Sequence, residues 1–185
     1  SFIPSRNGKT IADKIAKHVL KWIDPNFSKY TWLDRGSDER QYCSPGIDLP
    51  VGSLTRTRPG KYPEYHTSGD NFNIVKPKNL VESINIYKKC ILVFENNHIY
   101  KSTILCEPMM SKRGLYPGLS KKSNNTFLNN IKKKSNNNVY DMMTILYYCD
   151  GKRDLLSIAD KINKPLINLL PLVDILLDNK IIIKL

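Results

Sequence analysis

The sequence predicts an α/β domain followed by a small α+β winged-helix domain. Within residues 1–118, two segments carry apolar residues at helical spacing, and short β-branched stretches separate them. Residues 119–136 are polar and low in complexity, which is typical of a linker. Residues 137–185 are predicted to contain three short apolar helices and a β element, which is the winged-helix pattern. We therefore expect a domain at 1–118, a linker at 119–136 and a winged-helix domain at 137–185.

The first domain is predicted to open with a helix and to continue into a long loop. Thr10 is a favourable N-cap, and Asp13 stands three positions further on. Residues 31–72 are rich in Gly, Pro, Ser, Asp and Arg, so we expect loop around a brief strand near Val51. A second helix is predicted from 78 to 95, where apolar residues step by three and four: Leu80, Ile84, Tyr87, Ile91 and Phe94.

The end of the first domain is predicted to be a strand and a basic loop. Residues 98–105 alternate loosely and are β-branched, which is typical of a strand. Residues 109–118 contain Lys112-Arg113-Gly114, and we expect them to form a loop.

The winged-helix domain is predicted to hold three helices and a closing strand. Apolar faces indicate helices around Met143, around Ile158 and from 165 to 179. Asp150-Gly151 is expected to be a turn between the first two. Ile181-Ile182-Ile183 is the predicted strand.

The formal net charge of +12 and the pI near 9.5 invite a nucleic-acid partner. Lys, Asn and Ile are all abundant, however, which indicates a compositional bias, and several lysines fall in the predicted linker. The predicted third helix contains no Lys or Arg to meet phosphates. We therefore expect this helix to dock a protein partner or to form a homo-oligomer, and nucleic acid is not expected as a partner.

The cellular setting is indicated by hydropathy and cysteine usage. No run of apolar residues reaches the length of a membrane span, so no membrane association is expected. The four cysteines form no Cys-x-x-Cys pair, which argues against a structural zinc knot and a disulfide scaffold. A cytoplasmic protein with reduced thiols is the expectation.

The three histidines differ in their surroundings. His18 lies among charged residues of the first predicted helix, so we expect it at the surface. His98 stands at a helix-to-strand junction, where a local hydrogen bond is its expected role. His66 lies in a loop beside Glu64 and Asp70, where a histidine is either a polar surface residue or a metal ligand or catalyst.

Two motifs flank the strand predicted near Val51. The first is Gly36-Ser37-Asp38-Glu39-Arg40-Gln41-Tyr42, followed by Pro45-Gly46-Ile47. The second is Tyr62-Pro63-Glu64-Tyr65-His66-Thr67-Ser68-Gly69-Asp70. In a parallel α/β sheet, ligands bind where strands end, so loops that enter and leave one strand can converge on one pocket.

These motifs resemble those of the co-catalytic zinc aminopeptidases and their glutaminyl cyclase relatives. The chain is most similar to a bacterial subgroup that joins an aminopeptidase-like domain to a carboxy-terminal winged helix and is often labelled polysaccharide biosynthesis. Residues 36–46, Glu64-Tyr65-His66-Thr67-Ser68 and Lys112-Arg113-Gly114-Leu115-Tyr116 carry this similarity.

The resemblance implies a fold and a set of roles. Residues 1–118 would be the carboxy-terminal half of a three-layer aminopeptidase-like domain, and the cofactor would be zinc, bound by His66. Asp38, Glu39 and Asp70 would be catalytic or would support the metal site. The residues implied to contact a peptide or amide substrate are Arg40, Tyr42, Tyr65, Lys112 and Arg113.

The chain also departs from the family pattern. Glu39 stands where ordinary aminopeptidases have histidine. The family's other histidine, bridging aspartate and general-base glutamate lie on earlier strands, whereas residues 1–30 predict one helix. A zinc site needs three or four ligands, so we expect this chain alone to bind zinc weakly and to be inactive.

Three functions remain open from the sequence. The first is a zinc-dependent aminopeptidase-like hydrolase that cleaves a peptide or amide bond, with this chain as its carboxy-terminal part. The second is a non-enzymatic DNA-binding or regulatory module that uses the winged helix. The third is a degenerate fragment that serves as an interaction surface.

Overall fold

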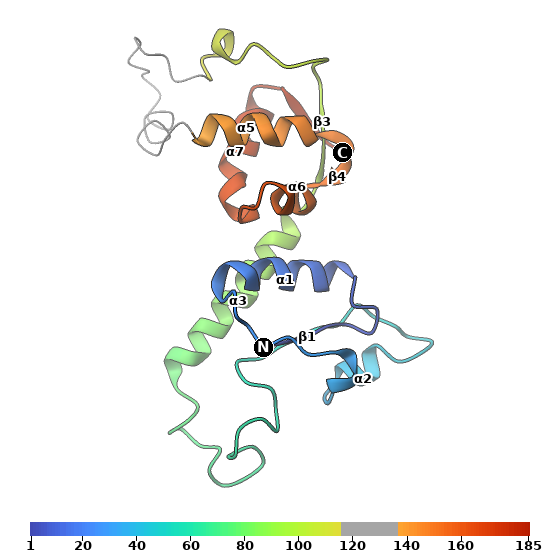
Figure 1. Ribbon diagram of the computed structural model, residues 1–185, viewed down its shortest axis with the longest axis vertical. Coiled ribbons are helices and arrows are strands. Elements are labelled where there is room, and N and C mark those ends of the chain that lie inside the picture. The colour runs from blue at the N-terminus through green and yellow to red at the C-terminus, as the bar shows by residue number, and fades with distance from the viewer. Residues whose placement is uncertain (116–136) are drawn as a thin grey trace. The chain divides into compact units, whose positions relative to one another are not determined.

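The computed structural model describes residues 1–115 and 137–185, so the predicted linker lies outside the described residues. The chain divides into two compact units, Ser1–Phe94 and Glu95–Leu185. Both units combine helices with short strands, which confirms the predicted mixed architecture (Figure 1). None of the helices in these two ranges is long and apolar enough to cross a membrane.

The first unit is built around helix α1 (Ile11–Ile23) and a two-stranded antiparallel sheet. Strands β1 (Phe2–Ile3) and β2 (Ser53–Leu54) pair with Phe2 opposite Leu54. A parallel bridge joins Phe2 to Lys29 on the other side of β1. The core is formed where α1 covers this sheet, by Phe2, Ala16, Leu20, Phe27, Leu54 and Ile86.

Helix α1 begins at Thr10 through the predicted capping box, and its Asp13 is fully buried. The Asp13 carboxylate accepts the backbone N–H groups of Ser5 (2.7 Å) and Thr10 (2.9 Å). It also accepts the Ser5 and Thr10 hydroxyls at 2.6 and 2.7 Å. Burial works against the charged form, but these hydrogen bonds outweigh it and lower the pKa of Asp13. The cap therefore also anchors the segment that follows β1.

Helix α3 (Pro77–Glu95) matches the predicted second helix, but it is the least buried long element of the unit. Val93 is its one buried residue. The loop region between α1 and α3 contains the 3-10 turn η1 (Trp32–Asp34) and the short helix α2 (Glu39–Tyr42). These two elements position the first motif.

The second unit contains a three-stranded antiparallel sheet in the order β4-β3-β5. Its strands are β3 (Ile99–Ser102), β4 (Asp150–Asp154) and β5 (Ile182–Lys184). Helices α5 (Asn137–Tyr148), α6 (Leu155–Lys161) and α7 (Leu166–Asp178) gather beside this sheet (Figure 1). A 3-10 turn, η2 (Met110–Arg113), follows β3. Fully buried side chains from the helices and from the residue before β5 form the core: Ile145, Leu155, Ile158, Leu166, Leu176 and Ile181.

The structure differs from the sequence-based predictions in four places. The prediction groups residues 98–105 with the first domain, whereas β3 is the central strand of the second unit. Asp150-Gly151 opens strand β4 in place of a simple turn. The first unit shows an antiparallel strand pair, not the parallel sheet that the motif argument assumed. The expectation of a surface His18 is wrong, because α1 turns this side chain into the interior.

Candidate functional site

The second motif folds into a tight series of turns between β2 and α3. The Thr67 hydroxyl donates to the Glu64 carbonyl at 2.8 Å and accepts the Gly69 N–H at 3.1 Å. A Cβ on Gly69 would stand 3.2 Å from Thr67 Oγ1 and 3.3 Å from Glu64 Cγ, so a larger residue there would require these two side chains to shift slightly. The Asp70 N–H then donates to the Thr67 carbonyl at 3.1 Å. Local hydrogen bonds thus fix the backbone on both sides of His66.

His66 itself adopts an uncommon backbone conformation. Its φ is +60°, in the left-handed region that residues other than glycine rarely occupy. The imidazole is exposed, and it stacks on the Tyr65 ring with centroids 4.0 Å apart and an interplanar angle of 25°. Tyr65 in turn meets Tyr62 edge to face at 5.6 Å. The loop therefore exposes to solvent an imidazole whose orientation is fixed by the Tyr65 ring. The backbone strain at His66 costs of the order of 1–3 kcal/mol.

The first motif forms the turn that opens α2. Glu39 is buried, and its carboxylate accepts the Gly36 N–H at 3.0 Å. Burial opposes the charge of Glu39, but hydrogen bonds from backbone N–H groups at 36, 37 and 39 lower its pKa. Asp38, by contrast, is exposed at the N-cap position. Glu39 thus closes its own turn, while the Asp38 carboxylate remains accessible.

Arg58 links the two motif-bearing loops. Its guanidinium donates to the Asp34 carbonyl at 3.1 and 3.3 Å, and lies 3.4 Å from the Asp34 carboxylate. It also covers the Tyr30 ring at 5.2 Å. The sequence reasoning missed this pair, although the arginines of Thr55-Arg56-Thr57-Arg58, placed between β2 and the His66 loop, were a usable signal. Arg58 thereby ties the segment before His66 to the segment before Asp38.

The remaining predicted site residues are distributed over both units. Arg40 and Tyr42 lie on α2 with exposed side chains, and Asp70 is exposed in the His66 loop. Asp70 acts on a neighbour in its loop: desolvation, and next the Asp70 charge, raises the pKa of Tyr62. Lys112 and Arg113 are exposed on η2, which belongs to the second unit.

Within residues 1–115 and 137–185, no three His, Cys, Asp or Glu side chains gather closely enough to hold a metal ion. His66 is thus one imidazole without a ligand set of its own in this part of the chain. Structural zinc sites need four ligands, and catalytic sites need three together with an open position. The described residues do not fit a zinc ion by themselves.

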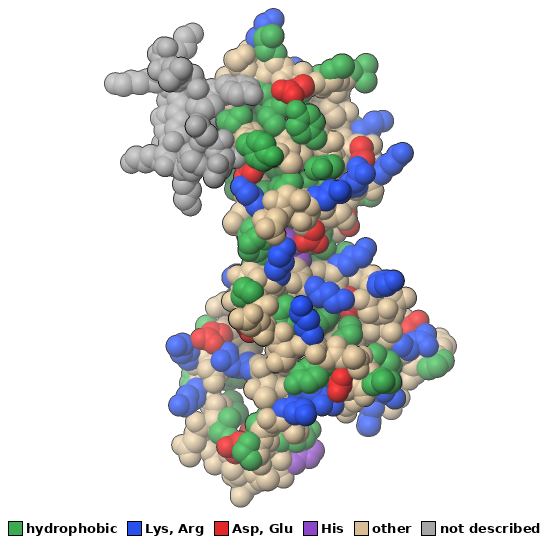
Figure 2. Space-filling view, in the orientation of Figure 1, with side chains coloured by type: hydrophobic (Ala, Val, Ile, Leu, Met, Phe, Trp, Pro, Cys, Tyr) green, Lys and Arg blue, Asp and Glu red, His purple; other side chains and the backbone are tan. Residues whose placement is uncertain are grey.

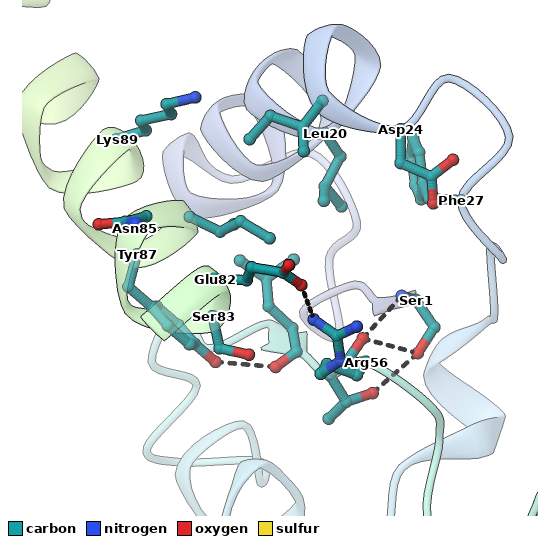
Figure 3. A pocket seen from close by; sticks show the side chains of 14 residues that line it. Ser1, Leu20, Asp24, Phe27, Arg56, Glu82, Ser83, Asn85, Tyr87 and Lys89 are labelled. Carbon is teal, nitrogen blue, oxygen red and sulfur yellow. Dashed lines mark hydrogen bonds and ion pairs between the residues drawn. The ribbon is translucent and has the colours of Figure 1, made fainter. Parts of the chain in front are cut away.

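A pocket of about 410 Å³ lies in the first unit between α1, β2 and α3 (Figure 3). Leu20 and Phe27 form apolar parts of its lining, and Tyr87 and the ion pair of Arg56 with Glu82 (2.5 Å) form polar parts. The sequence did not predict this pocket, because it depends on how α1, β2 and α3 pack together.

Family models divide the chain at nearly the same place as the two units. Residues 1–97 match a family described as a domain of unknown function, DUF4910. The chain belongs to the DUF4910 family. Residues 98–184 match a winged helix-turn-helix family, so the family assignment confirms the predicted winged helix.

Two relatives come from Clostridium acetobutylicum. One, named "Putative polysaccharide biosynthesis protein with aminopeptidase-like domain", is 37% identical over 155 residues, which are 83% of this chain and 33% of that protein. The other is a crystal structure described as that of a "putative peptidase", with a TM-score of 0.79 and 30% identity. It covers 100% of this chain and 38% of the crystallised one.

These relatives confirm the resemblance to winged-helix proteins with an aminopeptidase-like domain. They are also much longer than this chain. The chain spans about a third of the length of the proteins it matches.

Proposed function

We propose that this chain supplies the His66 loop to the zinc site of an aminopeptidase-like hydrolase that cleaves a peptide or amide bond. The observation that carries the proposal is the exposed imidazole of His66, held by a left-handed backbone and by the Tyr65 ring within the predicted motif. Strained residues of this kind cluster at functional sites. The names of the two relatives support the reaction class.

The remaining zinc ligands would come from sequence that the relatives possess outside their matched third. Bound zinc would supply Lewis-acid activation of water and of the substrate carbonyl. The residues of this chain have narrower roles. His66 would bind the metal, whereas Asp38 and Asp70 offer exposed carboxylates near the two motif turns. Glu39 would hold the α2 turn, because backbone N–H groups already occupy its carboxylate.

We propose substrate contacts for side chains of both units, all of them exposed except the half-buried Tyr65. Tyr42 and Tyr65 offer aromatic surface, and Arg40 offers a cation on the same unit. For Lys112 and Arg113 of η2 we propose contacts to an anionic end of the substrate. All four cysteines are free thiols, which suits the reducing cytoplasm that we propose as its location.

For the winged helix we propose docking or oligomerisation and not DNA binding. Helix α7 carries no Lys or Arg but includes Asp174 and Asp178, whereas recognition helices need cations or amides for phosphates and base edges. Figure 2 shows Lys and Arg side chains scattered over the visible face instead of gathered on one element.

Zinc content tests the hydrolase proposal. A hybrid is made in which this chain replaces the matched region of the polysaccharide biosynthesis relative, and zinc is measured by elemental analysis after dialysis. We expect about one or two zinc ions per hybrid and hydrolysis of aminoacyl p-nitroanilides, with both lost in His66→Ala.

His98→Ala is the matched control, because His98 belongs to the second unit and should leave zinc content unchanged. A zinc content that survives His66→Ala would exclude His66 as a ligand. The isolated chain gives a second measure: in a zinc titration followed by NMR, the His66 ring resonances should shift only at high zinc concentration, as expected of a single ligand.

A further inference from the structure

One face of α3 is apolar and yet open to solvent. Its five residues recur at helical spacing and are between 48% and 61% exposed: Leu80, Ile84, Tyr87, Ile91 and Phe94. We refer to these residues as the α3 stripe. Single exposed apolar residues are ordinary, but a contiguous row along a helix marks a surface that another chain segment covers.

Contacts on the flank of the stripe fix how α3 is held in the first unit. Ile86 packs on the core, and Glu82 pairs with Arg56 at 2.5 Å. From the stripe itself, the Tyr87 hydroxyl donates to the Leu54 carbonyl at 2.8 Å (Figure 3). The middle of the stripe is therefore bound to strand β2.

The carbonyl that Tyr87 reaches belongs to the open edge of the sheet. The Phe2 N–H donates to Ser28 O at 2.9 Å and the Phe2 carbonyl accepts the Tyr30 N–H at 3.0 Å, so both groups point away from β2. In an antiparallel pair, opposed residues direct their backbone groups either toward each other or both outward. Leu54 stands opposite Phe2, so its N–H and carbonyl also point outward.

In the described part of the chain, β2 pairs with β1 alone. An unpaired strand edge beside an apolar helix face is the half-site that strand addition completes: backbone groups extend the sheet, and side chains of the added strand cover the helix. The 410 Å³ pocket between α1, β2 and α3 lies on the same side of the unit as this edge.

We infer that the β2 edge and the α3 stripe together dock a strand-bearing polypeptide that carries the remainder of the aminopeptidase-like domain. The matched region is 33% of one relative and 38% of the other, and the crystal structure superposes on the whole of this chain. The part of such a protein that lies outside the matched region is therefore the occupant that we infer for the β2 edge and the α3 stripe. This inference rests on the proposed function, because strands added beside β2 would bring further ligands to the loop that follows it.

A second copy of this chain fits the surface less well. It would offer another α3 stripe to cover the first, but it would add only another His66 to the metal site. No strand of the described residues is left over to extend the sheet, since β1 pairs with β2 and the other three strands pair among themselves.

The experiment mixes this chain with the part of the polysaccharide biosynthesis relative that lies outside the matched region, in the presence of EDTA. Stoichiometry is measured by light scattering, affinity by calorimetry, and amide protection by hydrogen exchange. We expect a one-to-one complex in which amides of 53–56 and 80–94 gain protection.

Ile84→Asp should weaken the complex by at least about tenfold, because burial of an isoleucine is worth about that factor or more. Val81→Asp is the matched control: it adds the same charge to another exposed apolar residue of α3, outside the stripe and outside the pocket lining, and should bind like the parent chain. Circular dichroism verifies that both variants keep their helices.

Three results would overturn the inference: no complex, equal binding by the two variants, or a dimer of this chain that forms through the stripe. These outcomes are distinguishable from a failure of the proposed function. Complex formation is measured without metal and should persist in His66→Ala, whereas zinc content depends on His66 and tests only the hydrolase.

Discussion

At the scale of single residues, His66 and Asp13 show opposite ways of placing a polar group. His66 is held in a strained conformation and left accessible. Asp13 is fully buried, and its carboxylate accepts four hydrogen bonds. Backbone strain at an exposed residue suggests a role in binding, whereas a buried carboxylate with all its hydrogen bonds satisfied indicates a role in folding.

Relief of backbone strain at position 66 can be measured directly. A Gly there tolerates φ of +60° and an Ala does not, while both remove the imidazole. We expect His66→Gly to be more stable than His66→Ala by about 0.5–1 kcal/mol. Urea denaturation of the two variants gives the difference.

The same pair of substitutions at Ser68, which has no positive φ, serves as control, and there Ala should be the more stable residue. If Ala were also the better residue at 66, the left-handed conformation would not persist in solution.

Asp13→Asn should destabilise the protein by about 2 kcal/mol at pH 7, because charge-assisted hydrogen bonds are replaced by weaker ones. The folded-state pKa of Asp13 is lowered, so its contribution is complete above the unfolded pKa near ~3.9 and disappears as the pH falls through the lower folded value. Denaturation midpoints of parent and variant should therefore converge in acid. A difference that persists unchanged at pH 2 would contradict this account.

At the scale of elements, local signals in the sequence predicted the helices well. Thr10 marked the start of α1, and apolar spacing located α3, α6 and α7. The strands were harder, because β1 and β2 have two residues each and owe their conformation to partners far away in the sequence. Strand β4 was missed because Asp-Gly is a turn signal, while its pairing with β3 depends on tertiary contact.

The candidate site was predictable only in part. The motif located His66, but neither its left-handed φ nor the Arg58–Asp34 link leaves a local pattern in the sequence. The burial of Glu39 was equally hidden, since a charged residue in a loop is ordinarily exposed.

Helix α6 depends on a residue from outside the predicted winged-helix domain. Asn97 Oδ1 accepts the Leu156 N–H at 2.7 Å, and Asn97 Nδ2 donates to the Asp154 carboxylate at 3.1 Å. Asp154 in turn caps the helix by accepting the Ser157 N–H at 2.8 Å. We expect Asn97→Ala to cost about 1–2 kcal/mol, because an N-terminal amide of α6 loses its acceptor.

Thermal unfolding followed by near-ultraviolet dichroism measures this cost. Asn97→Asp tests the two hydrogen bonds of Asn97 separately. It keeps the acceptor for the Leu156 N–H but places a second carboxylate beside Asp154, so this variant should also be less stable than the parent protein. Parent-like stability in both variants would mean that Asn97 is not bonded to α6.

At the scale of the whole molecule, charge and length determine how the chain should behave. A net charge of +12 favours solubility and opposes self-association, which makes the exposed α3 stripe tolerable in the absence of the partner that we infer. The matched region is 33% of one relative and 38% of the other, so a lone imidazole in the described residues is compatible with the zinc site that we propose, whose other ligands come from elsewhere. The hydrolysis that we propose would therefore depend on ligands that the described residues do not supply.

The central position of β3 has a practical consequence for anyone who wants the winged helix by itself. Starting expression at 137 would keep every helix of the motif, yet it would delete the middle of the sheet and leave β4 and β5 with no neighbour. It would also discard Asn97 and thereby loosen the start of α6. The shortest autonomous piece should begin no later than Asn96.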